Sequence, residues 1–231
     1  MTTKILLIGP TGRTGRLVLD AALERGLAVR GLEREIDDDF CDHENFEFCS
    51  GDLLEGDFDS AMDGVDCVIS AVGLERDPQT LLDPPPLYTE GAVNIVRAMR
   101  RTQVRRLIVI SAAFANPHNS APRWFKASVL PLERVFRQMG EMERILRVCD
   151  DIEWTAVRPG WLLNRGFTGE YSVALDNLPP KTLRTRRADA AHFMLECALA
   201  GRHVREAPFI ARRESLALET PPALIEELLP F

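Results

Sequence analysis

The stretch that decides the fold is Lys4-Ile-Leu-Leu-Ile-Gly-Pro-Thr-Gly-Arg-Thr-Gly-Arg16. Its unbroken apolar run, residues 5–8, is typical of a strand buried on both faces of a parallel sheet. Three glycines follow, and apolar residues at helical spacing begin behind them at Leu17. A strand, a glycine-rich turn and a helix N-terminus in this order predict a site for a dinucleotide pyrophosphate, because the free N–H groups of the helix attract anions. The alternative is an ordinary β–α turn with nothing bound.

The length and composition of the chain favour a single globular unit. With 231 residues, of which 45% are hydrophobic and 27% charged, we predict one domain over residues 1–231. Within it we expect a dinucleotide-binding core at about 1–158, substrate-side elements at about 159–215 and a tail at 216–231. A monomer or small homo-oligomer is expected.

The charge and the cysteine content limit the kinds of binding partner and the cellular compartment that we expect for this chain. The net charge of −7 provides no basic field for nucleic acid. The five cysteines are scattered without metal-ligand spacing, so we expect reduced thiols in the cytoplasm, with neither disulfides nor a metal site. The first predicted strand leaves no room for a signal peptide, and no apolar run approaches membrane-spanning length, so no membrane partner is expected.

Beyond the glycine turn, further apolar runs alternate with segments of helical periodicity. The predicted strands are 27–33, 46–49, 66–71, 105–111 and 152–158, and the main later helices are 88–101, 132–149 and 187–200. This alternation predicts an α/β fold with a doubly wound parallel sheet of Rossmann type. Weaker signals predict a short strand at 170–175, an edge strand at 208–211 and an irregular lip at 112–131.

The end of the second predicted strand bears on the choice of cofactor. In Rossmann proteins an acid here pairs with the 2′-hydroxyl of NAD, whereas an arginine accommodates the 2′-phosphate of NADP. This chain has both, Glu33 and then Arg34, and Arg13 of the glycine turn can point to the same region. We predict NADP(H), since two arginines can neutralise a phosphate while Glu33 turns outward; NAD(H) is the alternative. The competing interpretation is that Arg34 pairs with an acid in 37–39.

Other candidate residues follow the ends of predicted strands. Asp52 can accept the adenine amino group, with Leu53 covering the ring, or Asp52 can instead cap a helix. Gly73 lets the chain turn beside the cofactor. Ser111, at the carboxyl end of a strand, is placed to contact a nicotinamide or a substrate carbonyl, although serine is also commonplace at such ends.

Aromatic residues are the candidates for the substrate side. Phe114 and Trp124 lie in the predicted lip, and Trp161 follows a later strand. Their flat apolar surfaces suit a ring-shaped acceptor. The alternative is that these rings only pack the lip onto the core.

Several motifs resemble, in one order, those of a known superfamily. They are Gly9-Pro-Thr-Gly-Arg-Thr-Gly15, Arg34, Gly51-Asp52, Glu90-Gly-Ala-Val-Asn94, Ser111 and Thr155-Ala-Val-Arg-Pro-Gly160. Together they resemble the atypical short-chain dehydrogenase/reductases, and particularly the NmrA-like and biliverdin reductase B (flavin reductase) branch. This resemblance implies a set of cofactor contacts: Gly9, Thr11, Gly12, Arg13, Thr14, Gly15, Arg34, Asp52, Leu53, Gly73, Ser111 and Pro159.

The chain departs from that pattern at two points. The proton-donating tyrosine with a lysine four residues later is absent, because Tyr88 and Tyr171 are followed at that spacing by Ala92 and Leu175. In addition, Trp161 stands where the biliverdin reductase B branch has a histidine, and only His118 could substitute for it.

The resemblance implies a reductase that uses NADPH to reduce a flavin, a quinone or a similar conjugated acceptor. Such acceptors stack on the nicotinamide and take their proton from solvent, so the missing tyrosine–lysine pair is no obstacle. Ser111 would position a carbonyl or the carboxamide, and Phe114, Trp124 and Trp161 would form the wall of the acceptor site. One alternative is a non-catalytic NADP(H)-binding sensor of the NmrA type. Another is an isomerase or cyclase that keeps the dinucleotide as a structural element.

Overall fold

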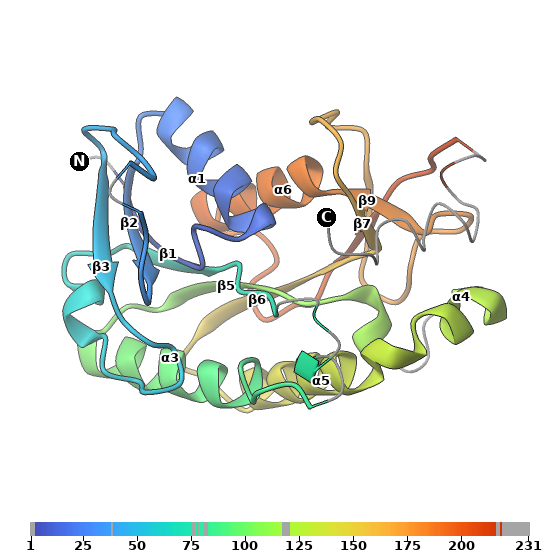
Figure 1. Ribbon diagram of the computed structural model, residues 1–231, viewed down its shortest axis with the longest axis horizontal. Coiled ribbons are helices and arrows are strands. Elements are labelled where there is room, and N and C mark those ends of the chain that lie inside the picture. The colour runs from blue at the N-terminus through green and yellow to red at the C-terminus, as the bar shows by residue number, and fades with distance from the viewer. Residues whose placement is uncertain are drawn as a thin grey trace.

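The centre of the protein, seen in a computed structural model, is one eight-stranded sheet with helices on both faces (Figure 1). The structure describes residues 3–37, 39–74, 77, 79–80, 83–116, 121–215 and 218. The strands are β1 (Lys4–Ile8), β2 (Ala28–Glu33), β3 (Phe46–Ser50), β4 (Cys67–Ser70), β5 (Arg106–Ile110), β6 (Glu153–Pro159), β8 (Ser172–Ala174) and β10 (Phe209–Ala211). Their spatial order is β3-β2-β1-β4-β5-β6-β10-β8, and every pairing is parallel except β10 with β8. The predicted doubly wound sheet is confirmed.

Two pairs of helices cover the two faces of the sheet. The helices α1 (Arg13–Glu24) and α6 (Arg187–Leu199) pack together on one face, and α3 (Thr89–Thr102) and α5 (Glu133–Arg147) lie on the other (Figure 1). Successive residues of a strand point to opposite faces. Accordingly Ile5 and Leu7 are buried with α1 and α6, while Leu6 and Ile8 are buried in the cluster that contains α3 and α5. This explains why β1 is apolar throughout.

Two predictions about short elements were wrong, and one small sheet was not predicted. Residues 208–211 do not form an edge strand, because β10 lies between β6 and β8. The segment 112–131 is not irregular throughout, since it contains α4 (Arg123–Ser128) and single 3-10 turns at Ala113–Ala115 and Leu130–Leu132. An unpredicted two-stranded parallel sheet joins β7 (Trp161–Leu163) to β9 (Arg184–Arg186). Such three-residue strands carry no periodic signal and depend on partners that are distant in the sequence.

Two predictions lie wholly or largely outside the described residues. They are the substitute role of His118 and the tail at 216–231, of which the structure describes only Leu218. In the described part of the chain, no helix is both long enough and apolar enough to cross a membrane.

Candidate functional site

The glycine turn lies at the carboxyl edge of the sheet, where the strand order reverses. The chain runs outward from β1 to β2 and β3, then returns to form β4 on the other side of β1. Open α/β sheets bind their ligands at such a switch point. Gly9 has φ +81°, and its Cα faces the backbone of Val72, which follows β4, so that an added Cβ would lie 3.2 Å from the Val72 Cα. The turn therefore fits closely into the space between two strand ends.

The N-terminus of α1 is left open by the glycine turn. Gly12 is the N-cap residue, with φ −66° and ψ 153°, and in the part of the chain that the structure describes no side-chain hydrogen bond caps this end of the helix. The first N–H groups of an uncapped helix are available to an anion. A Cβ on Gly15 would lie 1.9 Å from the Gly9 carbonyl oxygen, so only glycine allows α1 to begin this close to the turn. These features form the cradle that a dinucleotide pyrophosphate requires.

A buried arginine lies beside this turn, although its sequence context, in the pair Arg186-Arg187, favoured a solvent-exposed face, and that expectation was wrong for Arg187. Arg187, at the start of α6, donates from Nη1 to the Thr14 hydroxyl over 3.4 Å and from Nε to Asn164 Oδ1 over 2.5 Å. Both Thr14 and Arg187 are buried. The Arg187 guanidinium is thereby held next to the start of α1, although Arg187 and Thr14 are 173 positions apart in the sequence. No local sequence pattern predicts this contact.

The end of β2 carries one acid and one arginine with different environments. Glu33 accepts a 2.9 Å hydrogen bond from the Thr11 hydroxyl, so its carboxylate faces the glycine turn and is not turned outward as expected. Arg34 and Arg13 are exposed, and within the described residues neither guanidinium forms an ion pair or hydrogen bond. The expected competing pairs of Arg34 with Asp37 and Asp39 are not formed, and Asp38 lies outside the described residues.

The residues after β3 form a tight turn. Asp52 is half-buried, and its Oδ1 accepts a 2.7 Å hydrogen bond from the Leu54 N–H, which closes a turn and does not cap a helix. Leu53 is 6% exposed and packs into the core, so its side chain offers little surface to an adenine ring. Gly73 follows β4, and apart from its chain neighbours no atom of the described residues lies within 4 Å of an added Cβ.

Ser111 belongs to a buried polar network at the end of β5. Its hydroxyl donates a 2.8 Å hydrogen bond to Glu143 Oε1, and Ser111 and Glu143 are only 3% and 2% exposed. Arg158 of β6 donates to both oxygens of the same carboxylate, from Nε over 2.8 Å and also from Nη2. Because a hydroxyl has one proton, Ser111 can only accept a hydrogen bond from a bound group in this arrangement. Donation to a substrate carbonyl, as the sequence suggested, would require this bond to break.

Glu143 was not among the residues predicted from the sequence to belong to the site, although its position within an apolar helix face could have indicated it. It lies on α5 between Met142 and Leu146, within the apolar stripe of that helix. A carboxylate on a buried helix face is costly unless a cation and hydrogen-bond donors surround it. Here Arg158 and Ser111 provide them, from two neighbouring strands.

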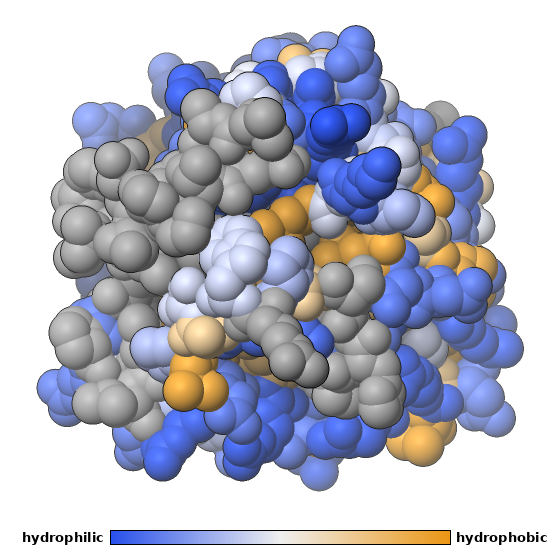
Figure 2. Space-filling model, turned by 90° about the vertical axis from the view of Figure 1, so that its right-hand side faces the viewer, coloured by the Kyte–Doolittle hydropathy of each residue, from blue (hydrophilic) through white to orange (hydrophobic). Residues whose placement is uncertain are grey.

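The predicted aromatic residues form one cluster beyond the ends of β5 and β6. The ring of Phe114 lies 4.5 Å from Phe125 and 6.4 Å from Trp161, and Phe125 and Trp161 are in edge contact at 5.6 Å. Trp161 is buried, whereas Trp124 is 38% exposed and lies 5.9 Å from Phe125. Figure 2 views the side of the molecule that bears α4, β7 and β9, and it shows apolar surface gathered in the middle of this face. Part of the cluster thus packs the lip onto the core, and part of it borders the surface.

Comparison with known proteins settles the family. A family model described as NAD(P)H-binding matches residues 9–200, which include the glycine turn and every element from α1 to α6. The chain belongs to this NAD(P)H-binding family. An uncharacterized chloroplastic protein of Arabidopsis thaliana is 28% identical over an alignment of 178 positions, which covers 73% of this chain and 62% of that protein. The chain thus spans less than two thirds of the length of this relative.

Solved structures share the fold at low sequence identity. A protein of Streptococcus pneumoniae, provisionally named an NADH-flavin reductase, is 22% identical with a TM-score of 0.72, over 91% of this chain and all of that one. A short-chain dehydrogenase/reductase of Veillonella parvula, solved with NADP, is 16% identical with a TM-score of 0.74, over 92% and 95% of the two chains. A provisionally named epimerase of Bacteroides thetaiotaomicron is 21% identical with a TM-score of 0.76, over 93% and 99%. At these identities the likeness shows the Rossmann-type fold alone.

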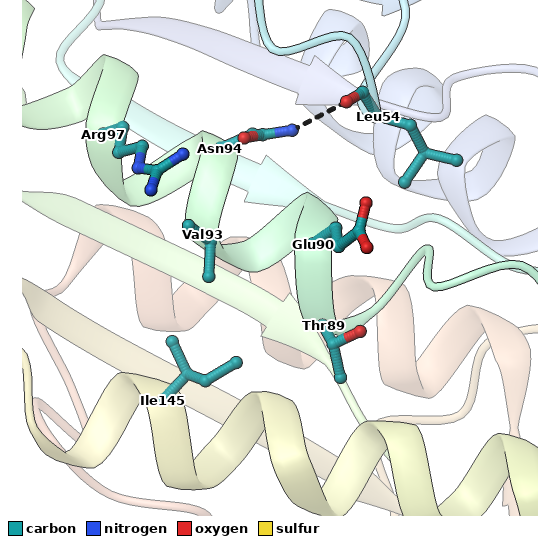
Figure 3. Close-up of a pocket in the computed structure, with 7 residues that line it drawn as sticks. All are labelled: Leu54, Thr89, Glu90, Val93, Asn94, Arg97 and Ile145. Carbon is teal, nitrogen blue, oxygen red and sulfur yellow. Dashed lines mark hydrogen bonds between the residues drawn. The ribbon is translucent and has the colours of Figure 1, made fainter.

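A separate surface pocket of about 350 Å³ lies between α3, α5 and the turn after β3 (Figure 3). It is lined by Leu54, Thr89, Glu90, Val93, Asn94, Arg97 and Ile145. None of the predicted contact residues of this NAD(P)H-binding protein lines it. The pocket is therefore distinct from the glycine-turn site.

Proposed function

We propose that this NAD(P)H-binding protein is an oxidoreductase that transfers a hydride to a flavin, a quinone or a similar conjugated acceptor. The observation that carries the proposal is the aromatic cluster of Phe114, Trp124, Phe125 and Trp161 beyond the ends of β5 and β6. The open N-terminus of α1 and the close-packed Gly15 suit the pyrophosphate, and the cofactor would supply the hydride. The aromatic rings would orient a flat acceptor against it.

Among the described residues of the cluster there is no proton donor, which fits acceptors of this kind. Ser111 has its proton committed to Glu143, and no tyrosine–lysine pair is present. Flavins and quinones can take their proton from water, so the protein need only bind and orient them. A simple carbonyl substrate would require a donor, and Ser111 and the described aromatic residues do not supply one.

The test is consumption of NADPH by the purified protein with FMN, riboflavin, several quinones and biliverdin, with NADH in parallel. We expect saturable turnover with at least one conjugated acceptor and none with simple aldehydes or ketones. A Trp124→Ala variant should raise KM for the acceptor, because Trp124 is the most exposed ring of the cluster. Tight NADPH binding without turnover on any acceptor would contradict the proposal and favour a regulatory NADP(H)-binding protein.

We further propose that NADP(H) is preferred over NAD(H). Support comes from Arg34 and Arg13, whose guanidinium groups are exposed at the end of β2 and in the glycine turn without partners among the described residues. The hydrogen bond between Thr11 and Glu33 supports the opposite preference, because it keeps a carboxylate where the ribose 2′-hydroxyl of NAD would bind.

Substitution of Arg34 distinguishes these cofactors. Arg34→Ala is expected to weaken NADPH binding by about tenfold to a hundredfold, as loss of a hydrogen bond to a charged group does, and to leave NADH binding nearly unchanged. Dissociation constants measured by fluorescence titration check this result. Arg97→Ala, at an exposed arginine of α3, is the control. Equal losses for both cofactors, or a larger loss of NADH affinity in Glu33→Gln, would identify Glu33 as the determinant.

We also propose a reducing, cytoplasmic location and a monomer or small homo-oligomer. All five cysteines are free, and burial raises the pKa of Cys67 and of Cys197 to about 12. Thiols with so little thiolate at neutral pH are unreactive, which suits a structural role.

A further inference from the structure

The motif Glu90-Gly-Ala-Val-Asn94 has no role in the site described so far. It forms the first turns of α3, and two of its residues contact the turn after β3. Asn94 donates from Nδ2 to the carbonyl oxygens of both Leu53 and Leu54, each over 3.0 Å. Figure 3 shows the amide pointing from α3 toward this turn. One side chain therefore satisfies two backbone acceptors of a segment 40 residues away.

The turn packs closely against α3 at Gly56 and Gly91, where a Cβ atom would be too close to a side chain of the opposite segment. An added Cβ on Gly91 would lie 2.8 Å from Leu53 Cδ2. Gly56 has φ +75°, and an added Cβ there would lie 2.9 Å from Asn94 Cγ. Within the turn, Asp52 Oδ1 accepts from the Leu54 N–H over 2.7 Å and the Asp52 carbonyl accepts from the Gly56 N–H over 3.2 Å. The position of Asp52 is thus coupled to α3 through Leu53 and Leu54.

The location of the turn explains why it needs this support. It follows β3, which is an edge strand and pairs with β2 alone. The Ser50 hydroxyl donates to the Arg34 carbonyl over 2.8 Å, which joins the end of β3 to the end of β2. Arg34 and Asp52 are the residues predicted to contact the ribose phosphate and the adenine. Contacts from α3 therefore hold the turn that bears Asp52, and the bond between Ser50 and Arg34 joins this turn to the end of β2.

We propose that Asn94 is a positioning residue that holds the turn 51–56 in place for the adenosine half of NAD(P)H. The inference rests on the proposed function, because it assumes that the adenosine lies over this turn. It assigns Asn94 no contact with the cofactor and no part in hydride transfer. Loss of its two hydrogen bonds leaves two carbonyl groups without this donor, and the turn is then free to move away from the position that receives adenine.

The experiment compares ligands that contain different halves of the cofactor. Asn94→Leu removes both N–H donors at similar side-chain volume. We expect this variant to bind NADPH and 2′,5′-ADP about tenfold more weakly, as loss of two net hydrogen bonds implies, and to bind reduced nicotinamide mononucleotide as the unaltered protein does. In steady-state kinetics, KM for NADPH should rise while kcat at saturating NADPH is unchanged. Arg97→Ala, one turn further along α3, should change none of these values.

Three outcomes would overturn the inference. They are unchanged affinity of Asn94→Leu for 2′,5′-ADP, equal losses for both halves of the cofactor, and a fall in kcat with no change in KM. If Asn94→Leu does not fold, Asn94→Asp replaces it, because an ionised carboxylate has a similar shape and no N–H group to donate to Leu53 and Leu54. Failure of the unaltered protein to bind NADPH or 2′,5′-ADP would refute the proposed function itself. Because this result is seen in the unaltered protein, it is distinguished from any effect of Asn94→Leu.

Discussion

Gly12→Val is expected to lower NAD(P)H affinity by about a hundredfold or more while the protein stays folded. The backbone of Gly12 has φ −66° and ψ 153°, which a β-branched residue adopts readily. An added Cβ would lie 3.4 Å from the Gly9 carbonyl oxygen and 3.8 Å from that of Ala71, which are ordinary contacts. The valine would nevertheless stand at the open end of α1 and keep the pyrophosphate from its N–H groups, each a charge-assisted contact of about 1.5–3 kcal/mol.

Gly15→Ala is the matched variant, three residues along the same turn. Its Cβ would lie 1.9 Å from the Gly9 carbonyl oxygen and 2.9 Å from the Gly9 carbonyl carbon, so backbone must move. We expect a loss of folding stability of at least about 1–3 kcal/mol, as overpacking produces. Circular dichroism melts and calorimetric titration with NADPH measure both quantities for both variants. Normal NADPH binding by a folded Gly12→Val protein would show that the glycine turn does not receive the cofactor.

Glu143→Leu is expected to lower the free energy of unfolding by about 3–5 kcal/mol, the usual cost of removing one member of a buried ion pair. The side chains of Glu143 and Arg158 are only 2% and 8% exposed, so Arg158 would be left with a buried charge and without its carboxylate. Ser111 would lose its hydrogen-bond acceptor as well. Urea unfolding monitored by tryptophan fluorescence measures the change.

Two further variants distinguish the effect of the buried charge on stability from the effect of altered packing. Glu133→Ala removes an exposed pair with Arg137 on the same helix and is expected to cost at most about 1 kcal/mol. The double variant Glu143→Leu/Arg158→Met removes both buried charges and should recover much of the lost stability, because no uncompensated charge remains. A double variant no more stable than Glu143→Leu would show that the burial of Arg158 is not the source of the loss.

The features that were predicted correctly depend on neighbouring residues. The apolar run of β1, the three glycines and the apolar face of α1 follow one another directly in the sequence. Their local pattern alone therefore predicts a strand, a turn and a helix. The same holds for the other strands that are buried on both faces, such as β5. From these segments the parallel α/β sheet follows, because short connections and helical crossovers allow few other arrangements.

The candidate site depends on contacts between distant parts of the chain, and these are not visible as local patterns. The bond from Thr11 to Glu33 spans 22 positions, that from Ser111 to Glu143 spans 32, and that from Asn94 to Leu54 spans 40. Each depends on which strand ends and helices come together, and on which side chains then face one another. The failed prediction for β10 has the same origin, because its place between β6 and β8 is decided by pairing across the sheet.

By itself, then, the sequence determined the Rossmann-type sheet and the place of the glycine turn between β1 and α1, because the periodicity of buried strands and the conformational needs of glycine are local properties. Only the tertiary structure decided that Glu33 faces the turn, that the Ser111 hydroxyl donates a hydrogen bond to the buried Glu143, and that Asn94 is hydrogen-bonded to the segment bearing Asp52. Buried polar groups must find partners wherever the fold provides them, and those partners come from elements that are far apart in the chain.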